Sequence, residues 1–226
     1  MLSESAKIRV KFSKTGSLKF ISHLDLNRTV KSAFLRSRLP IWYTQGFNPH
    51  PKTVFSLPLS VGTASLCEFM DFRVTEELSG EAICARLNEV FPSGLVALAA
   101  YTPTTKFQEI GWADYEIRIT RADTPVTPET VSAVQTALAG SVTVEKTTKA
   151  GTRTVDLAPL MRVLSVTEEG GELVLNLRLS CDEQNFVNPK YVIDYLASLC
   201  GVPAGLDDYT ICRTAVWRAD GTTPFL

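Results

Sequence analysis

The sequence predicts an α+β protein, because strand-like and helix-like segments follow one another twice in the order βαββαβ. Alternating apolar and polar residues mark the strands, and residues that cap helices stand before segments with helical apolar spacing. A βαββαβ unit is the pattern of a ferredoxin-like domain. The length of 226 residues suits two domains of about 100 residues each. We therefore expect two tandem ferredoxin-like domains, at residues 1–104 and 105–226.

The first domain opens with a strand at Lys7–Ser13, where apolar residues alternate with cations. A turn at 14–17 leads to a helix that Ser22 caps, and Pro40 limits this helix to about sixteen residues. The remaining expected elements are strands at Thr53–Leu59 and Cys67–Val74 joined by a turn at Ser60–Ser65, a helix capped by Ser79, and a strand at Leu95–Tyr101.

The second domain repeats this order after a boundary at Thr102–Trp112. Pro at the first helical position and Gly after the last one bracket its helices. The expected elements are a strand around Tyr115–Ile119, a helix from Thr127-Pro128, short strands near Val142–Glu145, Thr152–Asp156 and Met161–Thr167, a strand at Leu173–Leu179, a helix from Asn188-Pro189 to Gly201, and a strand at Tyr209–Trp217. An inserted hairpin is expected near Lys149-Ala150-Gly151.

Charge is unevenly distributed along the chain. Residues 1–60 contain ten Lys and Arg against two acidic residues, whereas the remainder contains 13 against 22. Such asymmetry indicates a surface that faces a polyanion, although solvated faces of different sign would give the same count.

Other features favour a soluble cytoplasmic protein without a metal or a cofactor. The five cysteines are widely spaced and form no CxxC pair, so neither a zinc site nor an iron–sulfur cluster is expected. The N-terminal residues do not resemble a signal peptide, and no apolar run is long enough to span a membrane.

The segment from Phe12 to Arg28 is the first candidate site. It places Lys14, Ser17 and Lys19 before a helix, with His23 in the first turn and Arg28 in the next. Exposed amides at a helix start, with nearby Lys, Ser and Gly, can bind an anion such as phosphate. The alternative is that Ser22 and Asp25 only cap the helix while His23 faces solvent.

The segment Tyr43–Lys52 is the second candidate site. Pro49 and Pro51 restrict the backbone on both sides of His50. Its rings, amides and lysine (Tyr43, Phe47, Gln45, Asn48 and Lys52) suit the recognition of unpaired nucleotides. The alternative is a proline-stiffened crossover loop whose aromatic rings plug the end of the sheet, and composition alone favours it.

Both segments also carry a resemblance to a known family. KFSKTGSLKFISHLDLNRT at Lys11–Thr29 and YTQGFNPHPKTVFSLPLSVG at Tyr43–Gly62 resemble the radical-SAM-associated proteins, whose members are encoded beside, or fused to, a radical SAM protein with a cobalamin-binding-type domain. The resemblance implies such a partner and a functional cluster of unknown role: Asp25, Arg28, Gln45, Gly46, Asn48, His50 and Lys52. Asn27 and Thr29 depart from the family pattern.

We expect a non-catalytic accessory protein that binds an RNA, such as tRNA or rRNA, and presents it to a radical SAM enzyme. One alternative is a metal-independent endoribonuclease that uses His23 and His50 as acid and base. Another is a protein-interaction scaffold without nucleic acid.

Overall fold

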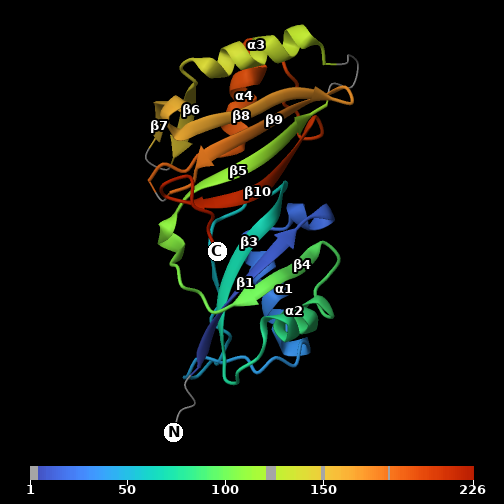
Figure 1. The fold of residues 1–226 in the computed structure, drawn as a ribbon, viewed down its shortest axis with the longest axis vertical. Helices are drawn as coiled ribbons and strands as arrows, with labels where there is room; N and C mark the ends of the chain where they lie inside the picture. Colours follow the sequence, from blue (N-terminus) through green and yellow to red (C-terminus); the bar gives the residue numbers. More distant parts are fainter. Residues whose placement is uncertain (1–4, 121–125, 149–150, 183) are drawn as a thin grey trace. The chain divides into compact units, whose positions relative to one another are not determined.

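The computed structural model describes residues 5–120, 126–148, 151–182 and 184–226. The chain forms two compact units, one comprising Met1–Glu109 with Leu226 and the other Ile110–Phe225 (Figure 1). Both combine helices with an antiparallel sheet, so the chain is a mixed α/β protein. Within the described residues, no helix has the length and apolar character to cross a membrane.

The first unit is an antiparallel sheet with two α-helices on one face. Its strands are adjacent in the order β4-β1-β3-β2. The elements are β1 (Ala6–Lys14), η1 (Gly16–Phe20), α1 (His23–Arg36), β2 (Val54–Phe55), β3 (Thr63–Val74), α2 (Gly80–Asn88), β4 (Leu95–Tyr101) and η2 (Phe107–Glu109).

Alternation in β1 produces the core of this unit. Ile8, Val10 and Phe12 are buried and pack with apolar side chains of β3, α1 and α2. Because successive residues of a strand point to opposite faces, the residues between them, among them Lys7 and Arg9, lie on the other face. The apolar contributions from the two helices are Leu26, Val30, Phe34, Ile83 and Leu87.

The second unit repeats the strand order of the first. Its main sheet is antiparallel in the order β10-β5-β9-β8, and β6 and β7 form a separate hairpin. The elements are β5 (Ile110–Ile119), α3 (Pro128–Ala139), β6 (Thr143–Thr148), β7 (Gly151–Asp156), η3 (Ala158–Leu160), β8 (Met161–Glu169), β9 (Glu172–Ser180), α4 (Pro189–Cys200) and β10 (Tyr209–Arg218). β6 and β7 pair where the inserted hairpin was expected, and Lys149 and Ala150 lie outside the described residues.

Three boundaries differ from the sequence prediction. The strand expected at Thr53–Leu59 is only Val54–Phe55, because Pro58 has no N–H to donate to a ladder. β3 starts at Thr63, inside the expected turn, and Ser65 pairs with Lys14 of β1. β5 starts at Ile110 because Gly111 meets Ala219, where an added Cβ would lie 2.6 Å from the Ala219 Cα.

A buried ion pair joins β1 to β3 on the face opposite the helices. Arg9 is fully buried, and its Nε and Nη2 donate to the two carboxylate oxygens of Asp71, its register partner, at 2.7 and 3.0 Å. Its Nη1 donates to the Thr105 hydroxyl at 2.7 Å, and its guanidinium lies 4.2 Å from the centroid of the Phe107 ring. The pair therefore also fixes the segment that follows β4.

We predict that Asp71→Ala destabilises the first unit by about 3–5 kcal/mol, because it removes the carboxylate that accepts two hydrogen bonds from the buried Arg9 guanidinium. Urea denaturation of the full chain measures this change. Asp25→Ala is the matched control, since it removes the carboxylate of the exposed Arg28 pair and should shift the transition much less. Equal shifts for the two variants would contradict the assigned role of the buried pair.

Candidate functional site

The first candidate segment runs from the end of β1 through η1 into α1. Ser17 and His23 are exposed, and Lys19 is half-buried. The Thr15 N–H donates to the Gly94 carbonyl at 2.8 Å, which fixes the start of η1 beside β4. Gly16 adopts a φ of 59°, which favours glycine at this turn.

Lys14 has a different environment from the other candidate cations. It is 2% exposed, and its ammonium lies 3.3 Å from the Ile21 carbonyl oxygen and 3.5 Å from that of Lys19. A buried ammonium that donates to loop carbonyls holds the loop in place. Lys14 therefore holds η1 in position through these carbonyl groups. The solvent-facing surface of the segment is formed by other residues of the segment.

Ser22 and Asp25 form a reciprocal cap at the start of α1. The Ser22 hydroxyl accepts from the Asp25 N–H at 3.1 Å and donates to the Asp25 carboxylate at 2.7 Å. Arg28 donates to the other carboxylate oxygen at 3.1 Å, with its side chain 78% exposed. The hydroxyl of Ser22, followed by Arg28, holds the pKa of Asp25 below its ordinary value. The expected cap is confirmed, and Arg28 keeps most of its guanidinium in solvent.

The second candidate segment is a loop closed at its base, which we call the Tyr43–Pro51 loop. Tyr43 and Pro51 form a β-bridge, and the Thr44 N–H donates to the His50 carbonyl at 3.0 Å. Gly46 adopts a φ of 131°, a conformation that side-chain-bearing residues rarely take. The exposed residues of the loop are Gln45, Gly46, Phe47, Asn48, Pro49 and His50, and Lys52 is exposed just beyond it.

The His50 ring is held in one orientation. Its Nδ1 lies 2.9 Å from the Asn48 carbonyl oxygen and 3.3 Å from the Thr44 hydroxyl. A carbonyl oxygen only accepts, so Nδ1 carries the proton, and in the neutral ring Nε2 is an acceptor. The His50 N–H also donates to the Thr44 hydroxyl, at 3.2 Å. Hydrogen bonds within the loop therefore fix the direction of the His50 ring.

Two contacts join the first candidate segment to Phe55 and Gly62, residues that follow the second candidate segment along the chain. The His23 ring packs edge-on against Phe55, three residues after Lys52, with ring centroids 5.2 Å apart. The Gly62 N–H donates to the Lys19 carbonyl at 2.8 Å, which joins the two sequence motifs. No described contact joins His23 to His50, because the hydrogen bonds of His50 stay within its own loop. We name the exposed residues of both segments, from Ser17 to Arg28 and from Gln45 to Lys52, the two-motif surface.

Phe47, one of the two rings named for the second candidate segment, is exposed. It is 113% exposed relative to the reference residue, which makes it the most exposed of the large apolar side chains described.

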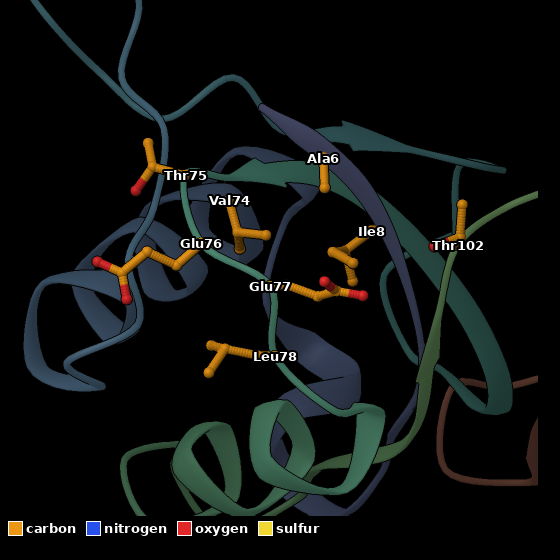
Figure 2. Close-up of a pocket in the computed structure, with 8 residues that line it drawn as sticks. All are labelled: Ala6, Ile8, Val74, Thr75, Glu76, Glu77, Leu78 and Thr102. Atoms are coloured by element: carbon orange, nitrogen blue, oxygen red, sulfur yellow. The ribbon is translucent and has the colours of Figure 1, made fainter. Parts of the chain in front are cut away.

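A pocket of about 290 Å³ lies where β1 begins and β3 ends, and its lining residue Val74 forms a β-bridge with Ile41. Its lining residues are Ala6, Ile8, Val74, Thr75, Glu76, Glu77, Leu78 and Thr102. In Figure 2 the Glu77 carboxylate lies on the side of Ile8, and that of Glu76 points to the opposite side. None of the candidate site residues lines it, so the pocket is separate from the two-motif surface.

The described cysteines and carboxylates give no metal site. In the described ranges, no group of three His, Cys, Asp or Glu side chains could hold a metal ion. All five cysteines are free, and burial raises the pKa of the Cys181 thiol to about 12. That thiol stays protonated at neutral pH.

Comparison with known proteins identifies a family over most of the chain. The family DUF2344, described as "Uncharacterized protein conserved in bacteria", matches residues 7–189. No curated protein matches. The matching solved structures include "Crystal Structure of an Unknown Protein from Galdieria sulphuraria", at 14% identity and a TM-score of 0.25, covering 92% of this chain and 96% of that chain. A TM-score this low supports neither a shared fold nor a shared function.

The depressed pKa of Asp25 predicts a pH dependence at the start of α1. The ionised carboxylate stabilises the cap above the ordinary carboxyl pKa of about 3.9, and this contribution is lost as the pH falls through the lower folded pKa. Ser22→Ala should raise the Asp25 pKa, and NMR titration of the carboxyl carbon measures it. Arg28→Gln is the comparison variant and should raise it less. A larger rise for Arg28→Gln would contradict the assignment.

Proposed function

The chain belongs to DUF2344, a family of uncharacterized proteins conserved in bacteria, and we propose that it is a non-catalytic accessory protein that binds RNA through the two-motif surface. The observation that carries this proposal is the meeting of the two motifs, through His23 with Phe55 and Lys19 with Gly62. These contacts join the first motif to the part of the second motif that follows the Tyr43–Pro51 loop, and the exposed cations, amides and imidazole of both motifs belong to the same unit.

Charge supports an RNA ligand. The two-motif surface lies within the part of the chain that carries ten Lys and Arg against two acidic residues. Arg28 and Lys52 are exposed, whereas Arg9 and Lys14 are buried in contacts within the unit. The exposed cations would neutralise phosphates, which supplies affinity without sequence preference. The exposed amides and the His50 Nε2 would contact base edges.

The partner in this proposal is a radical SAM protein of the cobalamin-binding type. It rests on the resemblance of the Lys11–Thr29 and Tyr43–Gly62 motifs to the radical-SAM-associated proteins. In this arrangement the chain presents an RNA, such as tRNA or rRNA, to the enzyme in the cytoplasm. The alternative of a scaffold without nucleic acid uses the same basic surface against an acidic patch of the partner.

We further infer that both units are ferredoxin-like domains. In each unit the first and second strands of the sheet are separated by a helix, as are the third and fourth. The order of adjacent strands is fourth, first, third, second in both, with antiparallel pairing throughout. These features support the domain assignment made from element order.

RNA binding should weaken steeply with salt. Fluorescence anisotropy with a labelled single-stranded RNA, from about 50 to 200 mM salt, measures the slope of log K against log salt. Arg28→Ala and Lys52→Ala should each reduce this slope by about 0.7, because each removes one phosphate contact.

Lys106→Ala is the matched control, since Lys106 is an exposed cation of the same unit that follows β4, outside both motifs, and it should leave the slope unchanged. Absence of binding at low salt, or affinity that does not vary with salt, would contradict the proposal. Cleavage of the probe in the presence of a chelator, lost in His23→Ala or His50→Ala, would favour the endoribonuclease instead.

Purification of the tagged chain from its own cells should recover a radical SAM enzyme together with a defined RNA. Mass spectrometry identifies the protein and sequencing identifies the RNA. Recovery of the enzyme without RNA would favour the scaffold alternative. Failure to recover a radical SAM enzyme under conditions that retain the RNA would contradict the proposed partner while leaving RNA binding in place.

A further inference from the structure

Phe47 occupies an unusual position for a large apolar side chain. It stands at the tip of the Tyr43–Pro51 loop and is 113% exposed. Phe usually gains stability by removing its ring from water, by about 25 cal/mol for each Å² buried. At this exposure Phe47 gains nothing of that kind from its own unit, so core packing does not explain its presence.

The exposure is built into the loop. The Tyr43–Pro51 bridge and the Thr44–His50 backbone hydrogen bond close the base. The Thr44 hydroxyl and the Asn48 carbonyl also bond to His50, from opposite sides of the tip. Gly46, at a φ of 131°, turns the chain immediately before the ring. A loop closed in this way presents Phe47 with little ordering left to occur on binding.

The neighbours of Phe47 indicate what the ring contacts. Gln45 and Asn48 are exposed amides, the His50 Nε2 is an acceptor in the neutral ring, and Lys52 supplies a positive charge. When a single apolar side chain anchors a protein partner, the side chain enters a pocket of that partner, and further apolar residues normally surround it. In the Tyr43–Pro51 loop the exposed residues on either side of Phe47 are hydrogen-bonding ones, and Lys52 follows the loop, a composition that is also found at sites that stack on nucleobases.

We propose that Phe47 is a stacking platform for an unpaired RNA base. In an A-form duplex the base faces are stacked on each other and the major groove is too narrow for side chains, so a protruding ring finds a free base face only in a loop, bulge or single strand. The inference rests on the proposed RNA-binding function and adds the class of substrate. Phe47 selects unpaired RNA, and the cations bind its phosphates.

The test compares Phe47→Leu and Phe47→Trp with the unchanged protein. The probes are a labelled single-stranded RNA of about 12 nucleotides and the duplex of that strand with its complement. Phe47→Leu keeps an apolar side chain and loses the aromatic face, so affinity for the single strand should fall about 5- to 100-fold. Phe47→Trp should retain or increase it. Neither variant should change duplex affinity or the salt slope.

Leu35→Ala is the matched control, because Leu35 is a 73% exposed apolar residue of α1 in the same unit, and it should leave both affinities unchanged. Circular dichroism should show all variants folded, since neither residue is in the core. If Phe47→Leu binds the single strand like the unchanged protein, the stacking inference is overturned while salt-dependent RNA binding stands. If the unchanged protein binds neither probe at low salt, the proposed function fails and the inference fails with it.

Discussion

The buried pair of Arg9 and Asp71 is the interaction on which the first unit depends. It lies between the two central strands and joins them to the chain that follows β4 through Thr105 and Phe107. Thr105 in turn donates to the Leu226 carbonyl at 2.6 Å, which brings the last residue to this unit. A buried ion pair adds little net stability over apolar packing, but an incorrect register leaves its charges unpaired at high cost. The pair therefore specifies how β1, β3 and the connecting segment assemble.

The two-motif surface depends on contacts beneath it. The buried Lys14 ammonium donates to the carbonyl oxygens of Lys19 and Ile21. The Phe55 ring packs against Phe12 of the core and against His23 of the surface. The exposed residues are thus attached to a rigid sheet through a few buried intermediaries. In the proposed function, such support would hold this part of the surface in one geometry before a ligand binds, which reduces the ordering cost of binding.

The sequence and the structure agree best where local chemistry decides the conformation. Ser22, Ser79 and Thr127 cap the helices they were expected to cap, and Gly201 ends α4 with a φ of 65°. They differ at Lys14, whose sequence context suggests an anion-binding side chain and whose ammonium is buried against carbonyls. Phe47 is exposed, so it does not plug the end of the sheet as the alternative interpretation of its loop expected. Whether a particular side chain is buried depends on the assembled sheet, and a short stretch of sequence does not determine this.

The sequence by itself determined the order of helices and strands, the caps, the basic character of residues 1–60 and the two motifs, because these follow from periodicity, composition and short-range hydrogen bonding. Only the tertiary structure decided which motif residues meet. His23 meets Phe55 and Lys19 meets Gly62, whereas His50 keeps to its own loop. The physical reason is that these contacts join residues 32 and 43 positions apart, and the pairing of distant strands and the packing of α1 on the sheet bring them together.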